Sequence, residues 1–373
     1  MTRTIVVTND FPPRPGGIQA FVHSLVAGQP ADSVIVYAST SPGAAAFDAG
    51  QPFKVIRAPT SMLLPTRAVA RRVAAVARAE GCTAALFGAA APLGLLAPAL
   101  RRAGVLRCVA LTHGHEIGWA ALPGARALLR RIGASLDVMT YLGEYTRSRL
   151  AGALGSAVRL ERLAPGVDTS MFTPATDGGE VRRRRGLAGR PIVVCVSRLV
   201  PRKGQDVLIR SLPAIRARVA GAALLLVGGG PDMARLQRLA VSCRVADDVV
   251  FTGPVEWPAL PGYYAAGDVF AMPCRTRRRG LDVEGLGMVY LEASATGLPV
   301  VAGDSGGAPD AVLAGRTGYV VDGRSVPAVA ERVASLLSDR AAAADMGAAG
   351  RAWVERDWRW DVVGERLSAL LTS

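Results

Sequence analysis

The sequence contains little lysine, few cysteines and few aromatic residues, and each shortage excludes a class of protein. Lys54 and Lys203 are the only lysines among 44 lysine and arginine residues, so arginine supplies almost all of the positive charge. The five cysteines form no CxxC pair, which argues against a structural zinc site or a disulfide framework and favours a reducing cytoplasm. Aromatic residues make up 5% of the chain, too few for a base-stacking platform, so we expect no nucleic-acid binding despite the runs Arg182–Arg185 and Arg277–Arg279.

Long hydrophobic segments of the kind that cross a membrane are also missing. The apolar run in the opening MTRTIVVTND is too short for a secretory signal. Residues 82–100 carry no charge, but glycine or proline interrupts them at four positions. This stretch therefore predicts a buried strand and a proline-started helix that ends at Arg101–Arg102, and not a spanning helix.

Short apolar runs that alternate with helix-like stretches predict an α/β fold with two doubly wound, parallel-sheet domains. Strands are expected at Ile5–Thr8, Ser33–Tyr37, Lys54–Arg57, Ala84–Phe87, Cys108–Thr112, Asp137–Tyr141, Ile192–Ser197, Ala223–Val227, Val249–Thr252, Asp268–Met272 and Pro299–Ala302. The polar, glycine- and arginine-rich segment 173–190 breaks the alternation and predicts a linker between a first domain at 1–172 and a second at 191–355. Two such domains would face a deep cleft at the carboxyl ends of their sheets, where ligands bind.

Two segments of the first half carry candidate site residues. Asn9–Gln19 follows the first strand, and its Gly16 and Gly17 would open a helix whose amides could face an anion, although taken alone they are better explained by an ordinary turn into a helix. The fingerprint GxGxxG is absent, which argues against an NAD enzyme. THGHEIGW, at residues 112–119, contains His113 and His115 at a strand end, where a polar group would meet substrate. We expect this role for His113, whereas a hydrogen bond to a loop carbonyl is the better explanation for His115, and a metal role lacks further ligands.

Two segments of the second half suggest a phosphate and a sugar site. In SRLVPRKG, Arg198 and Lys203 bracket a loop that enters a helix. Two fixed cations at such a place suit a diphosphate, and we favour this interpretation over that of solvated loop charges. In LDVEGLGMVYLEASATG, Glu284 and Glu292 flank a helix start where the amides of Met288 and Val289 could cap a phosphate. Asp282 and Glu284 imitate a DxD metal motif, but no other acidic group clusters with them in the sequence.

The motifs occur in the order expected of one family: Asn9–Gln19, His113, Arg198 with Lys203, and Glu284 with Glu292. Together they resemble the retaining GT-B glycosyltransferases of the family 4 type, over nearly the whole chain. THGHEIGWAALPG, SRLVPRKGQD, AMPCRTRRRGLDVEGLGMVYLEA and GGAPDAV are most similar to GDP-mannose-dependent phosphatidylinositol monomannoside α-1,6-mannosyltransferases of high-GC bacteria. The resemblance implies a GT-B fold whose C-terminal helix, 356–373, packs back on the first domain.

The resemblance also implies roles in donor binding. Arg198 and Lys203 would hold the donor diphosphate, and Glu292 would bind the ribose. Glu284 would bind the donor sugar hydroxyls. The backbone of Met288 and Val289 would lie beside that sugar, and the guanine would sit near Gly253–Val255, with Val255 as the nearest side chain.

For the first domain the resemblance implies contacts to the reaction centre and the acceptor. His113 would hydrogen-bond the transferred sugar, and Gly16 and Gly17 would let their loop approach the diphosphate and the acceptor, with Asn9 and Gln19 on the acceptor side. Arg278–Arg279 departs from the smaller, glycine-rich residues expected before Gly280, which leaves donor selectivity open.

The implied reaction is a retaining transfer of mannose from GDP-mannose, without a metal cofactor, to a phosphatidylinositol mannoside-type glycolipid as its second, α-1,6-linked mannose. No carboxylate is clearly placed as a nucleophile, which favours a front-face mechanism over double displacement. A same-fold transferase with another nucleotide sugar or another acceptor is the alternative enzyme, and a non-catalytic nucleotide-sugar or polyanion-binding protein is the alternative of another class. The oligomeric state and the choice of guanine over uracil stay open.

The positive charge is concentrated in the first domain, which bears on the acceptor. Residues 1–165 hold 18 cations and 8 anions, whereas residues 166–373 hold 26 and 22. On a helical wheel Arg67, Arg71 and Arg78 fall together, with valines on the opposite side. Such a helix could lie on an anionic membrane surface, which predicts a cytoplasmic protein that is peripheral at the inner face of the plasma membrane, although an ordinary surface helix has the same pattern.

Overall fold

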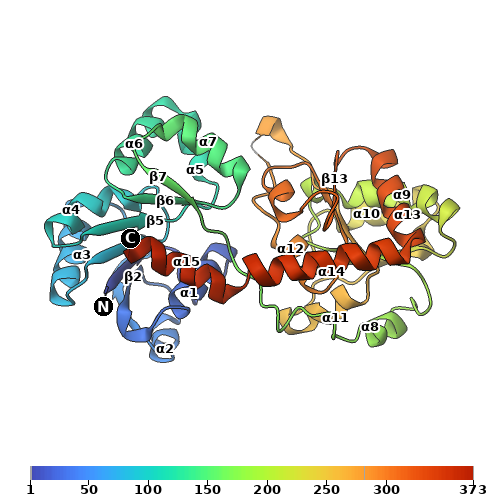
Figure 1. Ribbon diagram of the computed structural model, residues 1–373, viewed down its shortest axis with the longest axis horizontal. Helices are drawn as coiled ribbons and strands as arrows, with labels where there is room; N and C mark the ends of the chain where they lie inside the picture. Colours follow the sequence, from blue (N-terminus) through green and yellow to red (C-terminus); the bar gives the residue numbers. More distant parts are fainter. Residues whose placement is uncertain (1, 281, 373) are drawn as a thin grey trace. The chain divides into compact units, whose positions relative to one another are not determined.

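The computed structural model describes residues 2–280 and 282–372 and divides into two compact units (Figure 1). Unit 1 comprises Met1–Gly166 together with Trp360–Ser373, and unit 2 comprises Val167–Arg359. The C-terminal helix therefore belongs to unit 1, although it follows unit 2 in the sequence. Each unit is built around its own parallel sheet, which confirms the prediction of an α/β chain with two doubly wound sheets.

Unit 1 contains a seven-stranded parallel sheet in the order β3-β2-β1-β4-β5-β6-β7. Its strands are β1 (Thr4–Thr8), β2 (Val34–Ser39), β3 (Lys54–Ala58), β4 (Ala84–Phe87), β5 (Arg107–Ala110), β6 (Val138–Tyr141) and β7 (Arg159–Arg162). Its α-helices are α1 (Gly17–Ala27), α2 (Ala44–Ala49), α3 (Arg67–Ala79), α4 (Ala97–Arg102), α5 (Glu116–Ala121), α6 (Pro123–Gly133), α7 (Glu144–Leu154) and α15 (Trp360–Thr372). The chain runs from β1 toward β3 on one side and from β4 toward β7 on the other, so the topological switch point, where such sheets bind ligands, lies between β1 and β4.

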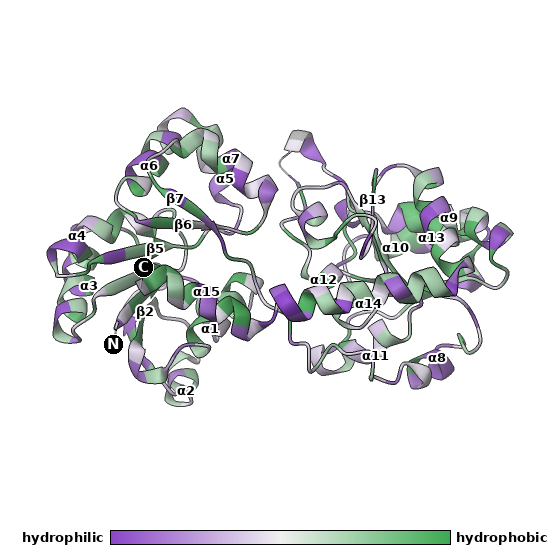
Figure 2. Cartoon of the chain, viewed as in Figure 1, coloured by the Kyte–Doolittle hydropathy of each residue, from purple (hydrophilic) through white to green (hydrophobic). Residues whose placement is uncertain are grey.

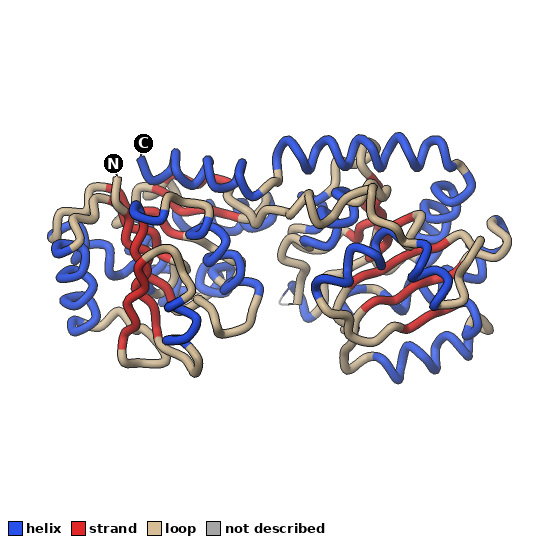
Figure 3. The backbone as a smooth tube through the Cα atoms, turned by 90° about the horizontal axis from the view of Figure 1, so that it is seen from below, coloured by secondary structure: helices blue, strands red, loops and turns tan. Residues whose placement is uncertain are grey.

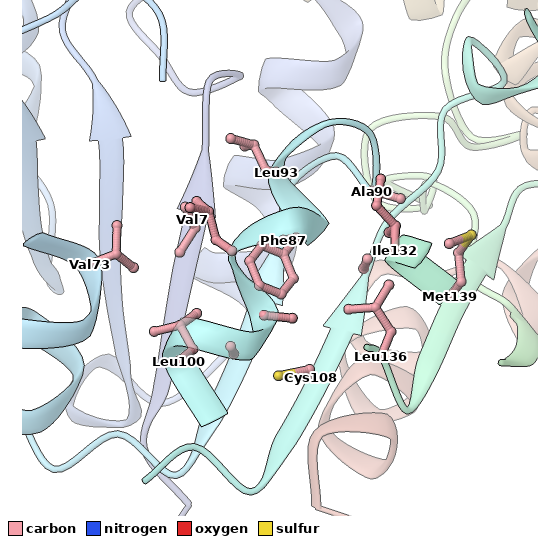
Figure 4. Packing of buried hydrophobic residues seen from close by; sticks show 14 of the residues in the cluster. Val7, Val73, Phe87, Ala90, Leu93, Leu100, Cys108, Ile132, Leu136 and Met139 are labelled. Atoms are coloured by element: carbon pink, nitrogen blue, oxygen red, sulfur yellow. The ribbon is translucent and has the colours of Figure 1, made fainter. Parts of the chain in front are cut away.

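The central strands of this sheet are buried on both faces, as parallel strands between helix layers require. Val7, Phe87 and Cys108 from adjacent strands pack with Leu100 of α4 and Ile132 of α6 in one apolar cluster (Figure 4). The mostly hydrophobic strands and the mixed helix surfaces are visible in Figure 2. This core holds the strand ends, and with them the loops that carry the candidate residues, in fixed positions.

Unit 2 contains a six-stranded parallel sheet in the order β10-β9-β8-β11-β12-β13, with helices on both of its faces (Figure 3). Its strands are β8 (Ile192–Val196), β9 (Ala223–Val227), β10 (Val249–Phe251), β11 (Val269–Met272), β12 (Val300–Gly303) and β13 (Gly318–Val321). Its α-helices are α8 (Gly179–Arg184), α9 (Gln205–Arg218), α10 (Met233–Ser242), α11 (Leu260–Ala265), α12 (Met288–Ala295), α13 (Val326–Ser338) and α14 (Arg340–Asp357). The sheet reverses its direction of growth between β8 and β11, and the carboxyl ends of these two strands carry the loops of the second candidate site.

Segment 173–190, which the sequence predicts as a linker, lies inside unit 2 and is packed there. A Cβ at Gly178 would lie 2.3 Å from the backbone carbon of Ala265, and Arg182 donates to the carbonyl of Ala266 at 3.0 Å and pairs with Asp268 at 2.9 Å. Arginines that look like a solvated run in the sequence thus fix α8 against the end of α11. The chain passes between the units at Gly166–Val167 and again at Arg359–Trp360.

Helix α15 packs on α1, β4 and β5 of unit 1 (Figure 1). Gln29, just after α1, donates to the carbonyl of Gly364 at 3.2 Å and accepts a hydrogen bond from Ser368 at 2.8 Å. Phe21 of α1 lies 6.2 Å from Trp360, measured between ring centroids. Among the described residues, no helix is both long and apolar enough to cross a membrane.

Candidate active site

The centre of the unit 2 site is a buried ion pair between Lys203 and Glu284. Lys203 Nζ lies 2.7 Å from Glu284 Oε2, and the two residues are only 8% and 6% exposed. Lys203 ends a short turn between β8 and α9, and Gly204 follows with φ +79°. A Cβ at Gly204 would lie 2.0 Å from the carbonyl oxygen of Pro273, so the turn that directs Lys203 inward needs glycine here.

Glu284 is held in place by the turn that follows β12. Its amide donates to Ser305 Oγ at 3.3 Å, and its carbonyl accepts from the amide of Gly307 at 2.9 Å. A Cβ at Gly306 would lie 2.0 Å from that carbonyl oxygen, so two backbone segments meet at a distance that only glycine permits. The SGGAP turn thus holds the backbone of Glu284.

Arg202 is a third charged residue of this site that the sequence reasoning missed. Its Nε lies 3.7 Å from Glu284 Oε2, and its Nη1 lies 3.7 Å from Asp282 Oδ1. Arg202 Nε is a buried atom that makes no hydrogen bond within the described part of the chain. Lys203 Nζ already contacts the Glu284 oxygen that Arg202 approaches, so two cations lie beside one carboxylate. The only signal was adjacency to Lys203, which an arginine-rich sequence obscures.

The carboxylates of the DxD-like segment are already engaged by cations. Asp282 Oδ2 lies 3.7 Å from Arg277 Nη1, in addition to its contact with Arg202, and Glu284 pairs with Lys203. Across residues 2–280 and 282–372, no group of three or more histidine, cysteine, aspartate or glutamate side chains is arranged to hold a metal. The side chain of Arg279, part of the departure noted at Arg278–Arg279, lies outside the described residues.

Arg198 and Val255 lie on loops at the same carboxyl edge of the sheet. The side chain of Arg198 is exposed, and the Nε2 atom of Gln205 fixes its loop by donating to Ser197 Oγ at 2.8 Å and to the carbonyl of Arg198 at 3.1 Å. Val255 is half-buried and follows β10, the edge strand beside β9. The structure therefore brings Lys203, Glu284 and Arg202 into contact and leaves Arg198 and Val255 further out along this edge.

Helix α12 supplies the remaining predicted donor residues. It begins at Met288 after Gly287, which has φ +81° and no side-chain cap, so the first amides, those of Met288 and Val289, donate no hydrogen bond to a capping side chain. Glu292 is one turn further on and is 7% exposed, with Oε2 accepting from the hydroxyl of Tyr264 at 2.5 Å. Burial raises the pKa of Glu292 to about 7, while the Tyr264 hydrogen bond acts in the opposite direction.

In unit 1, His113 follows β5 and reaches across to the loop after β4. Its Nε2 lies 2.6 Å from the carbonyl oxygen of Gly88. A carbonyl only accepts, so Nε2 carries the proton and Nδ1 of the neutral ring is an acceptor. The ring packs edge-on against Phe21, with centroids 5.9 Å apart. Burial lowers the pKa of His113 below its ordinary value, which favours this neutral form.

Glu116 holds the His113 loop, and the sequence reasoning missed this role. The residue is completely buried, and its Oε2 accepts from the amides of His113 at 3.0 Å and Gly114 at 3.2 Å. Its Oε1 makes no hydrogen bond to the described residues but lies 3.1 Å from Nε2 of the more exposed His115. A glutamate three positions after His113 at the start of α5 was the available signal.

The Asn9–Gln19 segment contains a structural residue and a polar pair. Asn9 donates from Nδ2 to the carbonyl of Leu63 at 3.0 Å and accepts from its amide at 2.6 Å, so its side chain is used to fix the loop before α3. This engagement argues against the predicted acceptor contact of Asn9. Gln19 Nε2 donates to Asp10 Oδ1 at 2.8 Å, and burial raises the pKa of Asp10.

The two glycines of this segment differ in their surroundings. A Cβ at Gly16, which has φ +155°, would lie 2.1 Å from Gln19 Oε1, so glycine is needed for Gln19 to fold back. A Cβ at Gly17 would meet nothing within 4 Å. Gly17, at the start of α1, is therefore open to the approach of a ligand.

The predicted basic face of α3 is present and continues onto α4. Arg67, Arg71 and Arg78 are exposed, and together with Arg102 they line a groove of about 780 Å³ whose floor is alanine. Val73 on the opposite side of α3 is buried in the core. The helix is therefore both an ordinary core-packed helix and a concentrated basic surface.

Comparison with known proteins matches both halves of the chain. Residues 15–171 match the family described as Glycosyltransferase Family 4, and residues 179–353 match the family Glycosyl transferases group 1. A GDP-mannose-dependent alpha-(1-6)-phosphatidylinositol monomannoside mannosyltransferase of Mycobacterium tuberculosis is 54% identical over 100% of this chain and 98% of that protein. The protein of the same name from Mycolicibacterium smegmatis is 53% identical, over 99% and 98%.

Three further matches extend the comparison. A GDP-mannose-dependent monoacylated alpha-(1-6)-phosphatidylinositol monomannoside mannosyltransferase of Corynebacterium glutamicum is 48% identical over 100% of this chain and 98% of that protein. Among solved structures, Anabaena HepE in complex with UDP has a TM-score of 0.81 at 18% identity, with both chains fully covered. Sucrose-phosphate synthase of Thermosynechococcus elongatus has a TM-score of 0.74 at 21% identity, over 99% and 98%. These structures show the fold, which is of the GT-B type as predicted.

The neutral state of His113 gives a pH prediction. Since the folded pKa lies below the ordinary value of 6.5, the unfolded chain binds this proton at a higher pH than the folded chain does. The neutral ring thus contributes stability that is present above about pH 6.5 and lost as the pH falls toward the folded pKa. We expect histidine ¹H–¹⁵N spectra, recorded as the pH is lowered from about 7, to show that His113 is protonated on Nε2 and stays neutral to a lower pH than an ordinary histidine does. A ring that titrates near 6.5, or that carries its proton on Nδ1, would contradict this assignment.

Proposed function

Since the chain belongs to the glycosyltransferases of group 1 and family 4, we propose that it transfers mannose from GDP-mannose to a phosphatidylinositol monomannoside. The new bond is α-1,6, and the configuration of the donor sugar is retained. Its full-length relatives with 48% to 54% identity carry names of this activity, which supports the choice of donor and acceptor class. The enzyme works at the inner face of the membrane, where an anionic lipid surface presents the acceptor.

The observation that carries the proposal is the Lys203–Glu284 pair with Arg202 beside it. Lys203 and the exposed Arg198 bind the donor diphosphate, with Arg202 as a third cation, and the amides of Met288 and Val289 complete that contact. Glu284 accepts hydrogen bonds from the mannose hydroxyls, and Glu292 accepts from the ribose. A binding site of this kind needs a cation and a carboxylate fixed a few ångströms apart, because diphosphate and sugar are adjacent in the donor.

The reaction follows from these contacts. The oxygen of an acceptor hydroxyl bonds to C1 of mannose as the bond from C1 to the β-phosphate oxygen breaks, and the hydroxyl proton passes to that phosphate oxygen. Fixed cations and amides stabilise the departing GDP, a contribution of about 3 kcal/mol for a single well-placed donor. From unit 1, His113 offers its Nδ1 acceptor to a hydroxyl of the transferred mannose.

A front-face course is supported by the state of the nearby carboxylates. Glu284 is paired with Lys203, Asp282 lies near two arginines, and Glu292 is hydrogen-bonded to Tyr264. An enzyme nucleophile needs a carboxylate free to attack C1, and each of these three is committed elsewhere. We propose that the cations themselves provide the charge that a metal supplies in other transferases.

The basic groove of α3 and α4 is proposed to contact the membrane. Arg67, Arg71, Arg78 and Arg102 present four positive charges on one face, and each contributes about 1 kcal/mol near an anionic surface. Exposed Met62 and Leu64 precede α3 and add apolar contact.

The transfer assay tests the reaction. Purified protein is incubated with labelled GDP-mannose or UDP-glucose and vesicles that contain phosphatidylinositol monomannoside, and the lipid product is analysed for its linkage. We expect an α-1,6-linked dimannoside from GDP-mannose, and a loss of about 100-fold or more in kcat for His113→Ala and Glu284→Gln. Glu331→Gln, at an exposed position of α13, is the matched control for the Glu284 substitution.

Three results would contradict the proposal in different ways. Absence of a lipid product from GDP-mannose would refute the reaction. Normal transfer by both variants would refute the site assignment, and a covalent mannosyl-enzyme in the mass spectrum of a stalled reaction would refute the front-face course.

Vesicle binding tests the membrane contact. The variant Arg67→Gln, Arg71→Gln, Arg78→Gln should sediment with phosphatidylinositol-containing vesicles at least about 10-fold more weakly than the wild type, because three screened attractions are removed. The control Arg210→Gln, Arg218→Gln, Arg238→Gln removes the same charge from exposed positions of unit 2. Equal loss in both triple variants would show that only net charge matters, and no loss in the first would refute the contact.

A further inference from the structure

Tyr264 and Glu292 form a buried pair that the reaction described above does not account for. Tyr264 of α11 is 0% exposed, and its hydroxyl donates to Glu292 Oε2 at 2.5 Å. A tyrosine this deeply buried commonly satisfies its hydroxyl with a backbone carbonyl or another neutral group. Here the Tyr264 hydroxyl donates its hydrogen bond to a carboxylate, which keeps that carboxylate in one orientation.

Other contacts also hold Tyr264 and Glu292 in place. The Tyr264 ring meets Phe172 edge-on at 5.5 Å and stacks on Phe270 at 5.8 Å between centroids, so its hydroxyl cannot move far. The carbonyl of Glu292 accepts from the amide and the hydroxyl of Thr296, at 3.0 and 2.9 Å. The hydrogen bond thus sets the rotation of the Glu292 carboxyl group about its own stem.

One neutral donor only partly compensates a buried carboxylate. An ionised carboxylate has about four acceptor positions on its two oxygens, and Tyr264 uses one of them on Oε2. Burial raises the pKa of Glu292 to about 7, so the carboxyl group is only partly ionised near neutral pH. A ligand with two adjacent hydroxyl groups would donate to the acceptor positions of Glu292 that Tyr264 does not use.

We propose that Tyr264 is a positioning residue for donor binding, which orients Glu292 so that its carboxylate receives the two vicinal hydroxyls of the nucleoside ribose. This rests on the proposed role of Glu292 in the donor site and extends it to a residue on a different helix. Tyr264 does not touch the reacting atoms. Its effect is therefore on donor affinity and not on the chemical step.

The pair also sets a pH dependence with a definite sign. Protonated Glu292 loses acceptor capacity, so the KM for GDP-mannose rises as the pH falls below about 7. Removing the Tyr264 hydroxyl removes a bond that favours the ionised form, and the rise in KM then begins at a higher pH. The other titratable group that acts on Tyr264 from a neighbouring element is Cys195 of β8, and burial raises its pKa to about 12, so it is neutral throughout.

The test uses Tyr264→Phe, which keeps the ring and deletes only the hydroxyl. GDP and 2′,3′-dideoxy-GDP are titrated into the full-length protein between about pH 5.5 and 9, and kcat is measured at saturating GDP-mannose. We expect the wild type to bind GDP more tightly than the dideoxy analogue. In Tyr264→Phe the ratio of the two affinities should fall about 10-fold, because a hydrogen bond to a charged group is lost. The kcat of the variant should stay within about 2-fold of the wild-type value. The control Tyr263→Phe alters the adjacent tyrosine, whose hydroxyl pairs with Arg185 at 2.9 Å.

The outcomes distinguish a failure of the role proposed for Glu292 from a failure of the role proposed for Tyr264. If wild type and Glu292→Gln bind GDP and the dideoxy analogue equally, Glu292 does not bind ribose and the donor-site assignment fails with this inference. If Glu292→Gln loses the preference while Tyr264→Phe keeps it with an unshifted pH midpoint, Tyr264 only packs and this inference alone is refuted. As a second probe that retains the hydroxyl, 3-fluorotyrosine at position 264 is a stronger donor and should move the pH midpoint downward; an unchanged midpoint would count against the inference.

Discussion

The ion pair between Lys203 and Glu284 is the interaction on which the unit 2 site depends. A lone charge at 6% to 8% exposure would cost several kcal/mol, so each residue stabilises the charge of the other. Each is delivered by a turn that only glycine allows, Gly204 on one side and Gly306 on the other, both in contact with backbone carbonyls. Two close backbone contacts thus place one buried pair of opposite charges at the carboxyl edge of a sheet.

That pair explains the arrangement around it. Arg202 approaches the same Glu284 oxygen at 3.7 Å, so two cations lie beside one carboxylate, and this excess of positive charge suits an anionic ligand. The neutral His113 of unit 1 fits the same logic, because a hydroxyl donor needs an acceptor and not a second cation. In both units the polar groups are held by loops, and the loops are held by a buried parallel sheet.

The sequence predicts the sheets well and their edges poorly. Eleven strands were expected from apolar runs, and the two missed strands are β7, whose residues RLER are polar, and β13, whose residues GYVV are short and begin with glycine. Both are edge strands, which need less burial and therefore leave a weaker pattern. Segment 173–190 resembles a linker in the sequence because several of its arginines pair with distant residues, as Arg182 does with Asp268 and Arg190 with Asp248.

The candidate site was accessible from the sequence only where a residue type stands out locally. Lys203 is one of two lysines, and the histidines near β5 are two of three, so composition alone draws attention to them. Arg202 and Tyr264 contact Glu284 and Glu292, which only the fold brings near, whereas Glu116 had a local signal in its position three residues after His113. Asn9 shows the converse, since a motif position that looks like a ligand contact is used to hold Leu63.

The most direct test of the central pair is the affinity of Lys203→Gln and Glu284→Gln for GDP and for GDP-mannose, measured by calorimetry beside the wild type. If Lys203 holds the diphosphate and Glu284 the sugar, Lys203→Gln weakens both ligands by the same factor, about 10-fold or more. Glu284→Gln should bind GDP nearly as the wild type does and lose the extra affinity that the mannose provides. Folded variants that both bind GDP and GDP-mannose with wild-type affinity would contradict the account.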